Sequence, residues 1–493
     1  MEIAKAPQSK PIKVYREMLK KKEEQEESNE FMIDDGSLKE RSKQQILSSI
    51  RALKSQISSK GEIVCIDDLQ TFVNENLYKE SRNQEFFVAD ALLGNGTKDN
   101  PIVITLTSRT CLNFIKEQAE SCIPQFAWDA TYKVNDLGYP LITTVTQDGE
   151  HSIFPTSFSI VSSESEATYT FCLNALKKSY FKLFKKKMPF KYIMSDAANY
   201  IFNATQKNCE NMKEHLVCFF HLKQAIKKNF AEKKVHKKDR KAILNCADDM
   251  QGSITQVQFD KYYELFKNEY FQYQEFLDYF DTYWVSQQSK TTKWRFFDME
   301  PGIFLTNNIC ESLNSSLKRD YMNRERKPLH QFLKTLKDIF IDISNENKKL
   351  KESPLITTNM KITAAQIEAK KLFIFRKGYY FTHKDCHSKL SLSVIDAFLD
   401  GRYTNIANMR ANLKIIVVLA FNNVKKEVTC FCKEGYTYNH CLHKMALEIY
   451  LGVRERIVLL QPNKRRGRKR RATKALEKEL PPVLKKNKRN QRN

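Results

Sequence analysis

Between about residues 121 and 235 the sequence alternates strand-like and helix-like segments in an order that few folds can accommodate. Three runs rich in β-branched and aromatic residues come first, and turn residues separate them: QFAWDATYKV, YPLITTVTQ and SIFPTSFSIV. The Asp148-Gly149 pair is a strong hairpin signal, so these runs are expected to form an antiparallel meander. A helix, a short strand, a helix, a strand and a helix follow: EATYTFCLNALKKSYFKLF, FKYIMS, AANYIFNATQKN, HLVCFF and LKQAIKKNF.

This order predicts an α/β fold with an RNase H-like catalytic core over residues 121–325. Long helical patterns over about residues 225–300 predict a helical insertion before the last core element. The flanking regions are predicted as a charged, disordered arm (1–36), a mostly helical region containing the short apolar stretch PIVITL (37–120), a helical connector (326–412), a small zinc module (413–452) and a basic tail (453–493).

Three acidic residues occupy separate motifs of the predicted core: Asp129 in FAWDATYK, Asp196 in YIMSDAAN and Glu311 in TNNICESLNSSLK. Asp129 lies in an apolar strand, where an unpaired charge costs several kcal/mol unless a cation compensates it. Two divalent ions about 4 Å apart need carboxylates from elements that are distant in sequence but adjacent in space. The three acids therefore predict a two-metal phosphodiester site for Mg²⁺ or Mn²⁺.

Each acid also has a purely structural interpretation. An acid at the end of a strand, such as Asp129, is common in turns and caps. Asp196 precedes a helix, where N-caps occur, and Asn308 with Glu311 has the spacing of a capping box. On the other hand, Glu311 shares a polar helix face with Ser315 and Lys318, and this face could line a cleft. The acids of the predicted hairpin turns are given no catalytic role: Asp136, Asp148 and Glu150.

The motifs WDATYK, SDAAN, CFFHLK and TNNICESLNSSLK, in this order, resemble the transposase domain of Mutator-like DNA transposons over about residues 100–325. The resemblance implies that Asp129, Asp196 and Glu311 are the carboxylates of a DDE-type transposase, which cleaves transposon ends and transfers strands into target DNA. It also implies a supporting role for His221 near the scissile phosphate. By themselves, Cys218 and His221 are more simply a buried thiol and a packed or capping histidine.

Residues 430–443 contain Cys-x-Cys, eight residues, and Cys-x-His, a spacing that suits tetrahedral Zn²⁺. The predicted ligands are Cys430 and Cys432 at a strand end, and Cys441 and His443 at a helix start. The pattern resembles a SWIM-type zinc finger, which often follows a Mutator-like catalytic domain. This zinc finger is expected to stabilise the fold and to contact DNA or protein. Other nearby donors are left out of the site: His440, and His383, Cys386 and His387 of a predicted surface loop.

The chain has 82 Lys and Arg against 58 Asp and Glu, and its net charge of +24 favours a polyanionic partner. The resemblance to Mutator-like transposases implies that this partner is double-stranded DNA, both as transposon ends and as target. Residues 463–493 contain 14 Lys or Arg and two acids, so 14 − 2 = 12 of that excess lies in the tail. The tail predicts nuclear import or phosphate contact, and hence the nucleus as the location. Arg466-Gly467-Arg468 resembles an AT-hook only weakly, because Lys469 replaces the usual proline. No secretory or membrane signal is found, so reduced cysteines and no membrane association are expected.

The sequence leaves two other functions open. The chain could be a domesticated transposase, which its host retains as a non-catalytic DNA-binding or regulatory protein, or a cellular RNase H-like nuclease. Many Mutator-like transposases carry an N-terminal zinc-dependent DNA-binding domain, whereas residues 1–120 contain no histidine for a Cys/His finger. Because two transposon ends must be held together, a homo-oligomer is expected during synapsis.

Overall fold

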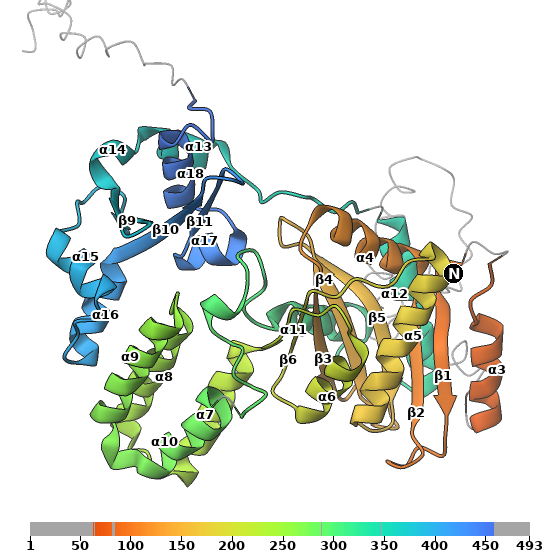
Figure 1. The fold of residues 1–493 in the computed structure, drawn as a ribbon. Helices are drawn as coiled ribbons and strands as arrows, with labels where there is room; N and C mark the ends of the chain where they lie inside the picture. Colours follow the sequence, from red (N-terminus) through yellow and green to blue (C-terminus); the bar gives the residue numbers. More distant parts are fainter. Residues whose placement is uncertain (1–62, 64, 81–83, 287, 347, 458–493) are drawn as a thin grey trace, which may run out of the picture.

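The structure is a computed structural model that describes residues 63, 65–80, 84–286, 288–346 and 348–457 (Figure 1). The predictions for the charged arm at residues 1–36 and for the tail beyond residue 457 lie outside the described residues. The described chain is a mixed α/β structure with a seven-stranded sheet, a group of helices and a smaller four-stranded sheet.

The seven-stranded sheet has the order β1-β2-β5-β4-β3-β6-β7. The pairs β3-β6 and β6-β7 are parallel, and the other pairs are antiparallel. Its strands are β1 (Phe87–Leu93), β2 (Ile102–Thr107), β3 (Gln125–Thr131), β4 (Leu141–Gln147), β5 (Ile153–Val161), β6 (Tyr192–Ser195) and β7 (Glu214–Val217). The Asp148-Gly149 hairpin is confirmed, since β4 and β5 pair in antiparallel fashion across it.

Helices cover both faces of this sheet (Figure 1). Successive strand residues point to opposite faces, so Phe126 and Trp128 join one apolar cluster and Ala127 joins another. The first face packs against α4 (Arg109–Ser121), α5 (Glu166–Phe184) and α6 (Asn199–Asn208). The second face packs against α3 (Ile66–Asn76), α11 (Asn308–Ser316) and α12 (Leu329–Asn345).

The prediction of a mostly helical region at residues 37–120 is wrong for β1 and β2, which extend the sheet beyond β5. All six residues of β2 are buried, with Ile102 and Ile104 on one face and Val103 on the other. A strand that is buried on both faces appears in the sequence as a continuous apolar run, and periodicity then cannot separate it from a helix.

The order β3, β4, β5, α5, β6, α6, β7 and α7 (Phe219–Glu232) is the predicted order of elements. Helices occupy the segment where the insertion is predicted: α8 (Lys237–Gln251), α9 (Gln256–Glu269) and α10 (Gln274–Phe280). Their aromatic core includes Phe259, Phe266 and Trp294. The same core contains Tyr403, Ile406 and Met409, which come from much later in the chain.

The predicted helical connector at residues 326–412 contains helices but also two strands. Besides α12, it holds α13 (Thr358–Gln366), α14 (Ala369–Leu372), β8 (Ile374–Arg376), β9 (Tyr379–His383) and α15 (Leu392–Leu399), and α16 (Ile406–Ile415) runs beyond its end. Lys377 and Gly378 both have positive φ (48° and 85°), as a tight two-residue hairpin turn requires. The prediction missed this hairpin because its strands are only three and five residues long.

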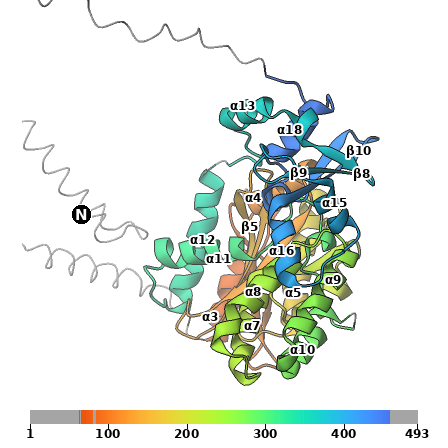
Figure 2. The same cartoon turned by 90° about the vertical axis from the view of Figure 1, so that its left-hand side faces the viewer.

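The hairpin belongs to the second sheet, whose order is β11-β10-β9-β8. The remaining elements are β10 (Ile416–Asn422), β11 (Glu427–Cys430), α17 (Lys433–Tyr438) and α18 (Leu442–Tyr450). In Figure 2 this module, in blue, lies at one end of the molecule, and helices α7 to α10, in green, lie at the other.

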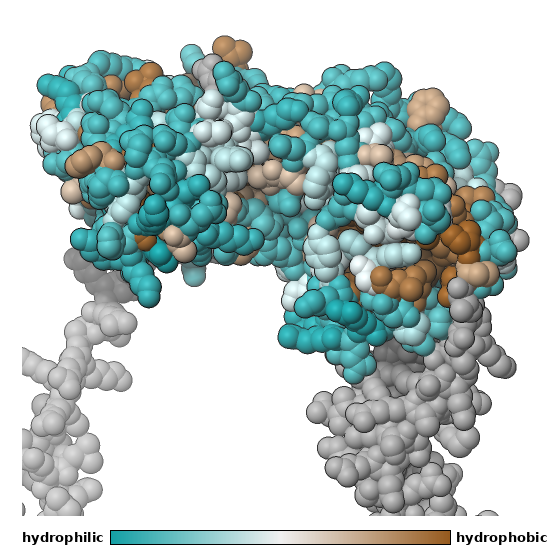
Figure 3. All heavy atoms as spheres, turned by 90° about the horizontal axis from the view of Figure 1, so that it is seen from below, coloured by the Kyte–Doolittle hydropathy of each residue, from teal (hydrophilic) through white to brown (hydrophobic). Residues whose placement is uncertain are grey.

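The face seen in Figure 3 is mainly hydrophilic, and its hydrophobic side chains gather in the right-hand part of the view. Within the described ranges, no helix combines the length and the apolar character that crossing a membrane requires.

Candidate active site and zinc site

The parallel pairing of β3 with β6 places Asp129 beside Asp196. Ala127 pairs with Met194, and the same register continued by two residues puts Asp129 opposite Asp196. Neighbouring strands lie about 4.8 Å apart, so the carboxylates of Asp129 and Asp196 are close to each other. Asp196 directly follows β6, and its Oδ1 accepts a hydrogen bond from the Ala198 N–H at 3.2 Å. It does not cap α6, which begins at Asn199 after Ala198.

Helix α11 brings Glu311 to the same place. Asn314 donates from Nδ2 to Oδ2 of Asp129 at 2.9 Å, and Asn307 donates from Nδ2 to the Trp128 carbonyl at 2.8 Å. These two hydrogen bonds connect α11, and Asn307 directly before it, to β3. The capping-box interpretation of Glu311 is wrong, because Asn308 lies inside the helix and the residue before it makes no side-chain cap.

His221 completes the group from the first turn of α7, directly after β7. Its Nε2 lies 3.8 Å from Oε1 of Glu311, and its Nδ1 is buried without a hydrogen-bond partner. Cys218, the residue before this helix, is fully buried and accepts a hydrogen bond at Sγ from the Asn307 N–H at 3.1 Å. Burial raises the pKa of the Cys218 thiol to about 11, so it remains a protonated packing group.

The electrostatics of the group favour a cation. Burial, together with the charges of Glu311 and Asp196, raises the pKa of Asp129 to about 7, although the Asn314 hydrogen bond acts in the opposite direction. Burial also raises the pKa of Asp196, while the Ala198 N–H and the charge of His221 lower it. Burial raises both pKa values, and neighbouring negative charge adds to the shift of Asp129, so a divalent ion would relieve both.

Sequence reasoning missed Glu164, which lies in the segment between β5 and α5. The Tyr169 hydroxyl donates to its Oε1 at 2.9 Å, and the Tyr132 hydroxyl donates to its Oε2. Its charge contributes to the raised pKa of Asp129, so it lies near the site. No signal in the sequence marked it, whereas Asn314 could have been found from its position one helical turn after Glu311.

The second candidate site lies in the four-stranded module. Cys430 ends β11, Cys432 precedes α17, Cys441 precedes α18 and His443 lies in the first turn of α18. Their ligand atoms all lie within 4.8 Å of one another. The predicted placement is confirmed for Cys430 at a strand end and for Cys441 and His443 at a helix start, whereas Cys432 lies beyond the strand and begins α17. In the described part of the chain no other group of this kind is found, so His383, Cys386 and His387 do not form one.

The Cys/His group suits zinc in several respects. His443 donates from Nε2 to the Lys384 carbonyl at 2.9 Å, which leaves the lone pair of its buried, unpartnered Nδ1 for a metal. The sulfur of Cys432 accepts the Gly435 N–H at 3.2 Å, and hydrogen bonds from Cys430 and Cys441 hold the pKa of Cys432 below the ordinary thiol value. A Cβ at Gly435 would lie 2.8 Å from Cβ of Cys430, so this glycine is needed for close packing.

The carboxylates form a more open arrangement than the zinc ligands. Of the described residues, only the Cys/His group has ligand atoms that all approach one another closely enough for one ion.

Part of the chain resembles a known protein family. Residues 126–225 match the family model of the MULE transposase domain. No curated protein matches the chain. The MULE match begins in β3 and ends within α7, so it includes Asp129, Asp196 and His221. It supports a transposase-family function, and the Cys/His group beyond it is compatible with a SWIM-type zinc finger.

Proposed function

We propose that the chain is a DDE-type DNA transposase of the Mutator-like class, with Asp129, Asp196 and Glu311 as its catalytic carboxylates. One observation carries the proposal. The register of β3 and β6 places Asp129 beside Asp196, and Asn314 bonds the helix of Glu311 to Asp129. Three acids from distant parts of the sequence thus reach one end of the sheet, beside His221.

The fold supports the same proposal. Three antiparallel strands, then helix, strand, helix, strand and helix, form the succession expected of an RNase H-like core. In the sheet, β3 lies in the middle of the five core strands, with β4 and β5 on one side and β6 and β7 on the other. Asp129 therefore lies on a central strand, so residues from the strands on either side of it can contribute to one site.

The donor set suits Mg²⁺ or Mn²⁺, which prefer carboxylate oxygens. When bound, such ions activate a water or a DNA 3′-hydroxyl and stabilise the leaving oxygen. Asp129 and Asp196 would hold them from the sheet, and Glu311 would hold them from α11. Asn314 keeps Oδ2 of Asp129 in one orientation, and His221 can orient Glu311 through Nε2 or hold a proton there.

The proposed partner is double-stranded DNA, both as transposon ends and as target. Helix α7 begins beside the carboxylates and carries the exposed Lys227 and Lys228, and α8 begins with the exposed Lys237 and Lys238. Lysines of this kind neutralise backbone phosphates irrespective of sequence. The proposal includes a structural Zn²⁺ at the Cys/His group, a nuclear location and a homo-oligomer at synapsis.

The proposal is tested by a cleavage assay on DNA with candidate transposon ends, with and without Mg²⁺ or Mn²⁺. Asp129→Asn, Asp196→Asn and Glu311→Gln should each abolish cleavage and leave DNA binding nearly intact. Asp136→Asn, which changes an exposed turn carboxylate, is the matched control and should cleave normally. Cleavage retained by one of the three variants removes that residue from the mechanism, and metal-independent cleavage removes the mechanism itself.

A further inference from the structure

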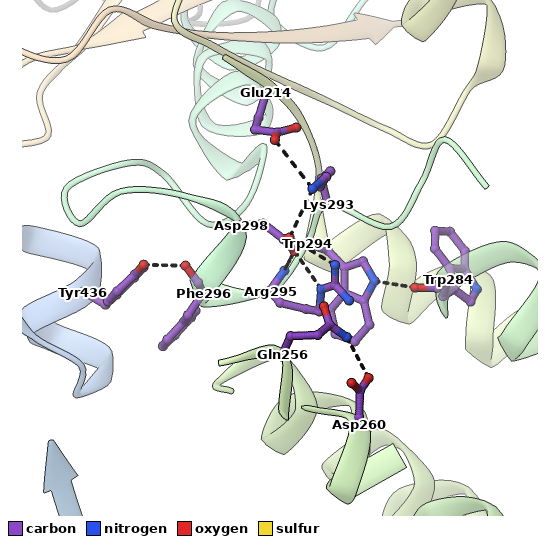
Figure 4. Close-up of polar contacts among 10 residues, drawn as sticks. All are labelled: Glu214, Gln256, Asp260, Trp284, Lys293, Trp294, Arg295, Phe296, Asp298 and Tyr436. Atoms are coloured by element: carbon purple, nitrogen blue, oxygen red, sulfur yellow. Dashed lines mark hydrogen bonds and ion pairs between the residues drawn. The ribbon is translucent and has the colours of Figure 1, made fainter. Parts of the chain in front are cut away.

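Tyr436 of α17 joins the zinc module to the loop that precedes Glu311. Its side chain is buried, and its ring stacks on that of Phe296, with centroids 4.7 Å apart and planes 3° from parallel. Its hydroxyl reaches the carbonyl of Phe296, as Figure 4 shows, and that of Met299 at 2.7 Å. A single side chain of the module thus contacts two backbone carbonyls, at the start and the end of one helical turn in the loop.

The backbone of the loop is also hydrogen-bonded to the backbone of α17. The Gly302 N–H donates to the carbonyl of Tyr436 at 2.8 Å. Gly302 has φ +91°, and a Cβ there would lie 3.4 Å from Cβ of Asn439. The positive φ favours glycine at this position, whereas a Cβ contact of this length would be an ordinary van der Waals contact.

The opposite side of the loop is fastened to the large sheet. Gln125, the first residue of β3, donates from Nε2 to the Gly302 carbonyl at 3.2 Å and accepts the Phe304 N–H at 3.1 Å. Earlier in the loop, Arg295 forms a buried two-pronged ion pair with Asp298 (2.8 and 3.1 Å; Figure 4). The loop is therefore held between the sheet and the zinc module.

Tyr436 belongs to an apolar cluster to which the strands and helices of the carboxylate site also contribute. The cluster contains Ala127, Met194, Cys218 and Cys310, besides the loop residues. Each of these four lies within three positions of a candidate site residue: Asp129, Asp196, His221 and Glu311, respectively. Packing in this cluster consequently bears on every element that carries the site.

We propose that Tyr436 is a positioning residue for the carboxylate site, through which the zinc module supports Glu311. The inference rests on the proposed function. Residues 433–440 are enclosed between the ligands Cys432 and Cys441, so bound zinc would fix α17 at both ends. Tyr436 then holds residues 296–302, and this segment leads through Phe304 into the helix of Glu311.

The test measures Mn²⁺ binding to the full-length, zinc-loaded chain by electron paramagnetic resonance. Tyr436→Ala should weaken Mn²⁺ binding about 10-fold, the size of effect typical of groups that support metal ligands. Tyr436→Phe keeps the ring and loses the hydroxyl, so a smaller loss is expected. Tyr438→Ala is the matched control, because Tyr438 lies on the same helix but packs edge-on against His151. It should bind Mn²⁺ as the wild type does.

A second readout is hydrogen exchange in the same proteins. Peptides covering residues 296–311 should exchange faster in Tyr436→Ala than in Tyr438→Ala, whereas peptides covering β2 should not change. Should the alanine variant lose its fold throughout, Tyr436→Phe decides, with faster exchange confined to residues 296–311 as the supporting result.

The outcomes separate the inference from the proposed function. If wild-type protein binds Mn²⁺ no better than Asp129→Asn, the proposed function fails. If wild type binds better than Asp129→Asn while the Tyr436 variants match wild type in both measurements, only the positioning role of Tyr436 is overturned.

Discussion

Asn314 donates a hydrogen bond from Nδ2 to Oδ2 of Asp129 at 2.9 Å, and this bond joins a helix to a strand 185 residues earlier. The amide favours the ionised carboxylate that a metal site needs, against burial and neighbouring charges that favour the protonated form. The balance between these effects leads to the first three predictions.

Asp129→Asn should stabilise the metal-free protein at pH 8 more than at pH 5. The folded pKa of Asp129, about 7, lies above its ordinary value, so ionisation costs folding free energy that grows as pH rises from about 4 to 7. At about 1.4 kcal/mol per pKa unit, the cost at pH 8 is on the order of 2–4 kcal/mol. Urea unfolding at both pH values measures it. Equal stabilisation at pH 5 and pH 8 would contradict the raised pKa, and Asp136→Asn serves as the control.

Asn314→Ala should move the acid limb of the cleavage pH profile to higher pH. Loss of a hydrogen bond to a charged group costs about 1.5 kcal/mol or more, equivalent to about one pKa unit. The pKa of Asp129 should rise by that amount, and kcat/KM near pH 7 should fall. Ser312→Ala, which changes an exposed serine of the same helix, should leave the profile in place. An unmoved acid limb in Asn314→Ala would show that the bond does not tune Asp129.

Glu164→Gln should move the acid limb of the cleavage pH profile to lower pH. The charge of Glu164 contributes to the raised pKa of Asp129, so its removal should lower that pKa by less than one unit. The amide keeps an oxygen for the Tyr169 hydroxyl, so the fold should be retained. The pH profile of kcat/KM, compared with that of Asn314→Ala, measures the effect. If the acid limb moves to higher pH in both variants, Glu164 does not act on Asp129 by charge repulsion.

Cys432→Ser and His443→Ala should lose zinc and melt at lower temperature than wild type. Structural zinc contributes directly to folding free energy, and a missing ligand leaves the enclosed site incomplete. Zinc content by mass spectrometry and thermal unfolding by circular dichroism measure the two effects. His440→Ala should retain one zinc per chain, because His440 lies outside the group of four ligand atoms. Zinc loss in that control would place His440 among the ligands.

Local sequence signals predicted the parts of the fold that depend on near neighbours. The hairpin at Asp148-Gly149 and the ligand spacing from Cys430 to His443 are such signals, and the structure agrees with both. Strands β1 and β2 were missed because burial on both faces removes the alternation of apolar and polar residues.

The geometry of the site depends on contacts that the sequence does not display. Asp129 and Asp196 could be selected because each follows or occupies an apolar strand. Their register, the bond to Asn314 and the approach of Glu164 arise only when segments far apart in the chain are packed together. Their catalytic roles stay predictions.

The aromatic core of the helical insertion is completed by Tyr403, Ile406 and Met409. Arg410 from the same late segment forms an ion pair with Asp249 and reaches the Tyr262 hydroxyl at 3.1 Å. A protein truncated at residue 325 would contain every proposed catalytic group and yet lack the side chains that close this core. The smallest part of the chain that can fold on its own therefore extends beyond residue 325, although the proposed catalytic residues all lie before it. Protein expressed for experiments should include the chain at least through α16.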